Sequence, residues 1–352
     1  MIRIRATQTL VAATAALSMT LATGAHAGVA TLAYHHVSTE TPPSTTTSPS
    51  LFRDQLDLIE ELDMETVSLT PERVEAVLDG EDADTLGVAL TFDDAYESVY
   101  TKAWPILREK GIPVTVFVLS GSVGDNGYMS WDQLREMAEH DLVTIGNHSL
   151  DHGTMLQRSG ESAEAHAERI ARELDQGAER IEEKLGIETE LFAHPYGEFS
   201  QPVLQALEDR GWYGFAQHSG VIGEHSHPGA MPRFAVADAY GGIDTLKDKL
   251  KARNFPVPRA QLPNPVITDD NPPLLDMTVP GDWDAGRLTC FASGEGMMEL
   301  ESESVSNGLR IQTRAQKPIE ARRSRYNCTY PAGDGRFYWL SQPWFNPEAP
   351  EG

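Results

Sequence analysis

Short apolar runs alternate with amphipathic segments from Gly28 to about Pro258. Helical periodicity in the amphipathic segments predicts helices. Strand–helix alternation over roughly 230 residues favours a parallel β/α sheet or barrel, whose active site gathers at the carboxyl ends of the strands. Runs rich in Val, Leu, Thr or Phe and bounded by turn residues predict strands at 30–34, 88–92, 114–119, 143–146 and 191–193. The predicted helices are 52–62, 71–78, 98–110, 131–140, 161–185 and 201–210.

The pattern changes after a proline-rich stretch at 256–273, which has the composition of a linker. Helical periodicity is lost beyond it, and β-like runs appear at 308–313 and 336–340. We therefore expect two domains, an α/β domain over 28–260 and a small β domain over 265–352.

The second domain contains both cysteines of the chain, Cys290 and Cys328. An isolated pair in an exported protein predicts a disulfide. Flat aromatic side chains in this domain suit stacking on sugar rings, but they equally suit the core of a small domain, and both interpretations stay open. These aromatic residues are Trp283, Phe337, Tyr338, Trp339, Trp344 and Phe345.

The first 27 residues have the features of a secretory signal. Arg3 and Arg5 form a basic start, an apolar run follows over 10–21, and small residues flank a cleavage site after Ala27. The apolar run is shorter than the ~20 residues of a membrane span. We expect a periplasmic or secreted protein without a membrane span.

The chain is strongly acidic, with 28 Lys and Arg against 53 Asp and Glu and a formal charge of −25. A nucleic-acid-binding protein usually presents a basic face, so this class is disfavoured. The electrostatic field of this negative net charge would also repel a polyanionic substrate. Neutral or cationic partners remain, and the oligomeric state is not fixed.

Two segments that follow predicted strands carry metal-binding chemistry. Asp93 and Asp94 end the strand 88–92, and neighbouring acids can take different roles if one binds a cation and the other stays free. His148 and His152 follow the strand 143–146, and on a helical turn this i, i+4 spacing puts both imidazoles on one face. Two imidazoles with a carboxylate are a common catalytic set for a divalent cation.

Two further strand ends carry candidate catalytic groups. His35, after the first strand, has an ordinary pKa that suits a general acid. The segment 195–197 forms a tight Pro-Tyr-Gly turn that can aim a backbone N–H at a developing oxyanion.

These segments together resemble the polysaccharide deacetylase family, also called the NodB homology domain or carbohydrate esterase family 4. The resemblance rests on Thr-Phe-Asp-Asp at 91–94, Asn-His-Ser-x-x-His at 147–152 and Pro-Tyr-Gly at 195–197, and it covers roughly residues 30–240. The segments 34–37 and 192–197 are more similar to the biofilm poly-N-acetylglucosamine deacetylase branch. The resemblance implies a distorted, incomplete (β/α) barrel and metal-dependent N-deacetylation.

Residue roles follow from this resemblance by position. Asp93 is expected to be the general base, and the backbone N–H of Tyr196 is expected to stabilise the oxyanion. One divalent metal ion is expected, zinc first, with Ni²⁺, Co²⁺ and Fe²⁺ as alternatives. Its implied ligands are Asp94, His148 and His152.

The sequence departs from the family pattern at two functional positions. The arginine that usually orients the base is replaced by Ala193, and Arg233 is a candidate to do this from another strand. The late Leu-x-His that usually supplies the acid is not evident, and the biofilm branch indicates His35 instead. Competing histidines are His218, His225 and His227.

The expected activity is removal of N-acetyl groups from an N-acetylglucosamine-containing polysaccharide, with release of acetate. One alternative is an O-acetyl esterase acting on xylan or another acetylated glycan, because the same centre could cleave an ester. Another is a catalytically weak glycan-binding protein. The four residues at 93, 94, 148 and 152 argue against loss of catalysis.

Overall fold

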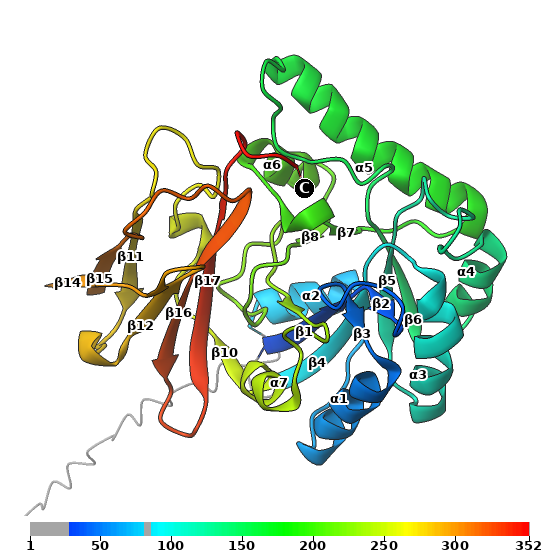
Figure 1. Cartoon of the computed structure of the whole chain (residues 1–352), viewed down its shortest axis with the longest axis horizontal. Helices are drawn as coiled ribbons and strands as arrows, with labels where there is room; N and C mark the ends of the chain where they lie inside the picture. The colour runs from blue at the N-terminus through cyan, green and yellow to red at the C-terminus, as the bar shows by residue number, and fades with distance from the viewer. Residues whose placement is uncertain (1–27, 81–85, 352) are drawn as a thin grey trace, which may run out of the picture.

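The computed structural model describes residues 28–80 and 86–351, so the predicted signal sequence lies outside the described residues. Seven parallel strands form a curled sheet, in the order β8-β7-β6-β5-β4-β1-β9, that closes only part of a barrel (Figure 1). The predicted incomplete (β/α) barrel is confirmed. The strands are β1 (Gly28–Tyr34), β4 (Leu86–Phe92), β5 (Val114–Val118), β6 (Val143–Asn147), β7 (Leu191–Ala193), β8 (Tyr213–Phe215) and β9 (Phe234–Ala235).

Helices cover the outside of this sheet, close to the ranges that the hydrophobic periodicity predicts (Figure 1). Thr70 caps the helix over 71–78 by accepting the N–H of Arg73, and Gly111 ends another in the left-handed conformation. The predicted helix 98–110 begins with a π-helical turn over Val99–Ala103. The helices are α1 (Pro49–Glu61), α2 (Pro71–Leu78), α3 (Trp104–Lys110), α4 (Trp131–Ala138), α5 (Ala163–Leu185), α6 (Gln201–Glu208) and α7 (Ile243–Leu250).

The parallel register brings the carboxyl ends of the strands to one edge. Tyr34 at the end of β1 lies opposite Phe92 at the end of β4, and Val118 of β5 lies opposite Asn147 of β6. These strands are almost entirely buried, as expected for a parallel sheet covered by helices. Residues that directly follow the strands therefore meet at this edge.

Two sheets make up most of the C-terminal domain, and all of their strand pairs are antiparallel except that of β10 with β17. The five-stranded sheet has the order β10-β17-β16-β12-β13 and the three-stranded sheet the order β11-β15-β14. Cys290 and Cys328 lie opposite each other on β12 and β16 and form a disulfide, as predicted. The strands are β10 (Ala252–Asn254), β11 (Leu275–Pro280), β12 (Thr289–Ala292), β13 (Gly296–Met297), β14 (Glu301–Val305), β15 (Gly308–Thr313), β16 (Arg323–Pro331) and β17 (Phe337–Phe345).

The two domains are packed against each other. Strand β10 directly follows the last helix of the first domain and pairs in parallel with β17 of the second. Trp339 packs edge-on against Phe234 of β9, with 5.4 Å between ring centroids, and Phe345 packs similarly against Phe199. These aromatic side chains serve domain packing. A short pair formed by β2 (His36–Val37) and β3 (Thr46–Thr47) lies beside the strand ends.

Trp283 also packs against other aromatic rings, those of Tyr330 and Tyr338, at centroid distances of 4.3 and 5.2 Å. Phe337 remains partly exposed. Among the helices of the described ranges, none combines the length and the apolar character that crossing a bilayer requires.

Candidate active site

Two adjacent carboxylates follow β4. Asp94 and Ala95 both adopt left-handed backbone conformations, with φ of 72° and 59°, so the chain turns sharply there. Both carboxylates are buried, Asp93 completely and Asp94 at 5% exposure. Side chains of adjacent residues in a strand point to opposite faces, and this turn lets the two carboxylates serve one site.

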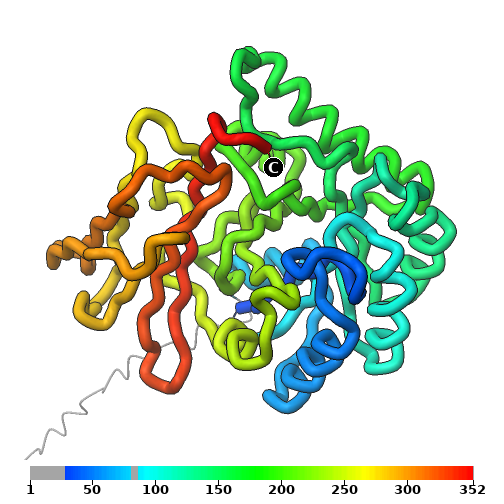
Figure 2. Tube along the Cα trace, in the orientation of Figure 1, coloured from blue at the N-terminus to red at the C-terminus, as the bar shows by residue number. Residues whose placement is uncertain are grey.

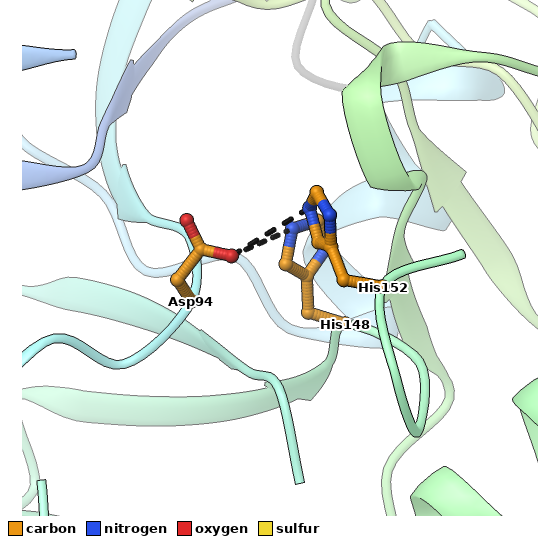
Figure 3. A group of neighbouring side chains, drawn as sticks. All are labelled: Asp94, His148 and His152. Carbon is orange, nitrogen blue, oxygen red and sulfur yellow. Dashed lines mark ion pairs between the residues drawn. The ribbon is translucent and has the colours of Figure 1, made fainter. Parts of the chain in front are cut away.

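Asp94 faces His148 and His152 (Figure 3). Its Oδ1 lies 3.5 Å from Nε2 of His148 and 3.6 Å from Nε2 of His152. Ligand atoms that share one zinc ion at about 2.1 Å and a tetrahedral angle lie roughly 3.4 Å apart. The spacing of these three side chains therefore suits a single divalent cation.

The hydrogen bonds of His148 support the same assignment. Its Nδ1–H donates to the carbonyl oxygen of Ala193 at 2.8 Å, which fixes the tautomer and leaves a lone pair on Nε2. That Nε2 is buried and has no hydrogen-bond partner. A lone pair beside a carboxylate oxygen is unfavourable unless a cation lies between them. The residues present thus fit the metal that the sequence predicts.

The segment between the two histidines is not the helical turn that the spacing predicts. Ser149 and His152 both have left-handed φ values, 69° and 60°, which an α-helix excludes. The Asn147 side chain accepts the N–H of Ser149, and the Ser149 hydroxyl accepts the N–H of His152. These local side-chain bonds replace helical ones and still bring the two imidazoles together, with 4.8 Å between ring centroids.

Burial lowers the pKa of His152 to about 4, and the nearby His148 adds to this effect. The imidazole is therefore neutral at ordinary pH, which is the form that binds a metal.

Arg233 binds Asp93 from the start of β9, which is separated from β4 by β1 in the sheet. Its Nη1 and Nη2 donate to the two carboxylate oxygens of Asp93 at 2.7 and 2.8 Å, and both side chains are fully buried. Burial alone would raise the pKa of Asp93, but the Arg233 guanidinium keeps this pKa well below its ordinary value. Arg233 directly precedes β9, so it approaches the carboxylate from another strand, as the sequence analysis considered.

His35 lies beside Asp93, with its Nε2 4.0 Å from the Asp93 Oδ2. It lines the cleft described below. The adjacent His36 instead stacks on Tyr96, with 3.6 Å between ring centroids. The two neighbouring histidines therefore have separate environments, and His35 is the one beside the carboxylate.

The competing histidines occupy different places. His225 and His227 line a second, small cavity, while His218 lines both this cavity and the cleft. Burial lowers the pKa of His218 well below its ordinary value, with Arg259 and Arg325 contributing. A neutral His218 lacks the proton that a general acid must donate. Of these histidines, His35 has the geometry that best suits the acid.

Tyr196 lies in a tight 3₁₀ turn, Pro195–Gly197, with a left-handed φ of 57°. Its ring meets that of His152 edge-on, at a centroid distance of 4.4 Å. The turn thus sits directly beside the Asp94–His148–His152 group.

A cleft of about 430 Å³ opens over these residues. The first domain contributes His35, Asp94 and Tyr196 to its lining. The second domain contributes the opposite wall, and this contribution was not predicted. Its lining residues are Ser293, Arg323, Ser324, Arg325, Pro343 and Phe345.

The sequence did contain a signal for this wall. The segment 321–325 reads Ala-Arg-Arg-Ser-Arg, a local cluster of positive charge in a strongly acidic chain. A further residue of the site that the sequence did not indicate is Gln217, whose amide donates to the Asp93 Oδ2 at 3.4 Å. Glutamine after a three-residue strand carries no recognisable pattern.

Solved structures share this fold. An IcaB structure from Ammonifex degensii matches with a TM-score of 0.55 and 27% identity, covering 64% of this chain and 96% of that one. The deacetylase PplD from Streptococcus pyogenes also has a TM-score of 0.55, at 21% identity, covering 64% of this chain and 99% of that one. The first domain therefore has the fold of these proteins.

The sequence comparison agrees. The polysaccharide deacetylase family model matches residues 81–214. A poly-β-1,6-N-acetyl-D-glucosamine N-deacetylase from Staphylococcus aureus is 26% identical over 158 residues, which is 43% of this chain and 54% of that protein. This chain spans about half the length of the curated relatives it matches. The chain contains a polysaccharide deacetylase domain, and its similarities support the biofilm branch of that family.

Proposed function

We propose that this protein is a metal-dependent N-deacetylase of N-acetylglucosamine-containing polysaccharide. The observation that carries the proposal is the convergence of Asp94, His148 and His152 beside the buried Asp93–Arg233 pair. The family match and the relatives named for N-deacetylation of poly-N-acetylglucosamine support the reaction and the substrate class.

Asp94, His148 and His152 would hold the divalent cation, with zinc as the expected ion. Such a cation polarises a carbonyl oxygen and lowers the pKa of a water molecule. The hydrogen bond from Nδ1–H of His148 to the carbonyl oxygen of Ala193 directs its Nε2 to this site. The chain thus supplies a preorganised set of three donors.

The other residues divide the proton transfers between them. Asp93 accepts a proton from the attacking water, and Arg233 keeps its carboxylate ionised and oriented. The backbone N–H of Tyr196 donates to the developing oxyanion. His35, whose Nε2 lies 4.0 Å from the Asp93 Oδ2, donates a proton to the leaving nitrogen. The products are acetate and a glucosamine unit.

The test is an acetate-release screen with the purified protein and its bound metal quantified. We expect release from β-1,6-linked N-acetylglucosamine oligomers, with little or none from acetylated xylan. Preferential release from xylan would indicate an O-acetyl esterase instead. Binding of the oligomers without any release would indicate a glycan-binding protein.

We also propose that the protein is exported after cleavage behind Ala27. The basic start and the apolar run at 10–21 support this proposal. N-terminal sequencing of protein recovered from the periplasm or the medium should begin at Gly28. Recovery of the uncleaved chain from the cytoplasm alone would contradict export.

A further inference from the structure

Glu198 is a completely buried carboxylate that belongs to the first domain but is paired with the second. It accepts from Nε of Arg322 at 2.9 Å and from Nη1 of Arg323 at 3.1 Å. Its other partner is the hydroxyl of Thr154, at 2.6 Å. The Arg322 side chain is itself only 9% exposed, so this is a buried ion pair across the domain interface.

The first-domain partners lie next to the candidate catalytic residues in the sequence. Glu198 is two residues after Tyr196, and Thr154 is two residues after His152. Both Tyr196 and His152 have left-handed backbone conformations, with φ of 57° and 60°. Such conformations in non-glycine residues persist only where the surrounding structure holds them.

Arg322 connects these two loops through a single guanidinium group. Its Nη2 donates to the Thr154 hydroxyl at 2.8 Å and also reaches Glu198 at 3.2 Å. Its Nη1 donates to the carbonyl oxygens of Pro347 and Ala349, in the C-terminal segment that crosses back over the first domain (Figure 2). The same side chain thus ties two active-site loops to the end of the chain.

Arg323 adds a contact on the cleft side. Its guanidinium carbon lies 4.7 Å from the ring centroid of Tyr196, the geometry of a cation–π interaction. The Tyr196 ring therefore lies between Arg323 and His152, which it contacts edge-on.

We propose that Thr154, Glu198, Arg322 and Arg323 form an interdomain latch that positions His152 and Tyr196. These four are positioning residues, so the C-terminal domain contributes to the geometry of the deacetylase site. The proposal rests on the proposed function for its consequences in catalysis, but not for the geometry of the loops. Residues that orient metal ligands typically alter metal affinity 10–100-fold when changed.

The loop on both sides of His152 has other hydrogen bonds that remain when the latch is removed. Glu173 accepts the N–H groups of Leu150 and Asp151, and Arg169 donates to the carbonyl oxygens of Thr154 and Leu156. We therefore expect loss of the latch to loosen the loop rather than unfold it.

The first test compares Arg322→Ala with Arg310→Ala. Arg310 forms an ion pair with Asp276 on strands of the same domain, away from the cleft, so it is a matched control. We expect Arg322→Ala to weaken zinc affinity by about 10–100-fold. It should also lower kcat more than it raises KM, and increase hydrogen exchange in peptides covering 148–158 and 194–200. Arg310→Ala should leave all three unchanged.

Arg322→Ala leaves Glu198 with less of its buried partner charge, which can unfold a protein for unrelated reasons. The double variant E198Q/R322M removes both charges and avoids this problem. It still lacks the guanidinium bridge, so zinc affinity and hydrogen exchange should change as in Arg322→Ala. A folded double variant with wild-type zinc affinity, kcat and exchange would overturn the latch.

Failure of the proposed function would look different. Zinc affinity and hydrogen exchange require no substrate, so they report on the latch even if no glycan is deacetylated. If the wild-type protein releases no acetate while Arg322→Ala still loosens both loops, the latch stands and the proposed reaction is wrong.

Discussion

The two walls of the cleft are built on different principles. The first-domain wall includes residues that closely follow parallel strands, such as His35 after β1 and Asp94 after β4. The second-domain wall is formed mainly where the start of β16 pairs with the end of β17, two antiparallel strands (Figure 1). The first carries the candidate chemistry, and the second carries positive charge with Arg323 and Arg325.

This difference separates what a deacetylase fold must contain from what this chain adds. Strand ends of a parallel sheet meet at one edge whatever lies outside it, so the chemical groups can be held by short motifs. The second wall requires a whole domain to dock in one orientation. We therefore expect changes in the first wall to act directly on turnover and metal. Changes in the second wall should act on substrate binding and, through Arg323 in the latch, indirectly on the loops that carry His152 and Tyr196.

The largest effect is expected from His148→Ala in the first domain. This change removes a buried ligand whose tautomer is fixed by Ala193, so bound zinc and activity should be lost together, activity by at least about 10³-fold. Metal analysis and acetate release on the same preparation check it. A variant that retains stoichiometric metal and full turnover would remove His148 from the site.

Asp93→Asn should lower kcat by about 10²–10⁴-fold while bound metal stays near stoichiometric. The change also leaves Arg233 buried without its carboxylate, which should cost about 3–5 kcal/mol of stability. Turnover must therefore be measured below the lowered Tm, with the fold checked by circular dichroism. Metal lost in step with activity would show that the roles of the two aspartates need to be exchanged.

His35→Ala should lower kcat by about 10²–10⁴-fold without loss of metal, because a general acid contributes to protonation of the leaving group. The deficit should shrink for an aryl acetate, whose leaving group needs no proton. His36→Ala is the matched control, since His36 itself does not line the cleft, although the Tyr96 ring on which it stacks does. A damaging His36→Ala beside a mild His35→Ala would reverse the assignment, and two mild variants would indicate His218.

The smallest effect is expected in the second wall, from Arg325→Ala. Arg325 lines the cleft, and within residues 28–80 and 86–351 no carboxylate lies at ion-pairing distance from its guanidinium. It is therefore available to donate hydrogen bonds to oxygen atoms of a bound glycan. We expect KM to rise about 10-fold, the loss of one charge-assisted hydrogen bond, with kcat nearly unchanged. An unchanged KM across oligomers of increasing length would exclude this contact.

The sequence by itself predicted much of the first domain. Apolar runs and helical periodicity indicated the strands up to Leu191–Ala193 and the helices up to Gln201–Glu208, because these signals are local. It missed the strands β8 and β9, since strands of two or three residues carry little pattern, and it also missed the eight-residue helix α7. It also predicted the disulfide, because two cysteines in one domain of a chain that is predicted to be exported leave a single pairing.

The sequence likewise indicated Asp93, Asp94, His148 and His152 from short motifs. It named Arg233 as a candidate to orient Asp93 from another strand, and it favoured His35 as the acid over His218, His225 and His227. The tertiary structure places both side chains beside Asp93, although they come from different strands and Arg233 is 140 positions from Asp93.

Only the tertiary structure showed that the second domain forms a wall of the cleft. From sequence, the Arg322–Arg323 pair is indistinguishable from a solvated basic segment. Its role depends on a carboxylate 124 residues away that becomes completely buried when the domains pack. Burial and partner choice are properties of the packed chain, and local sequence determines only which groups are available to it.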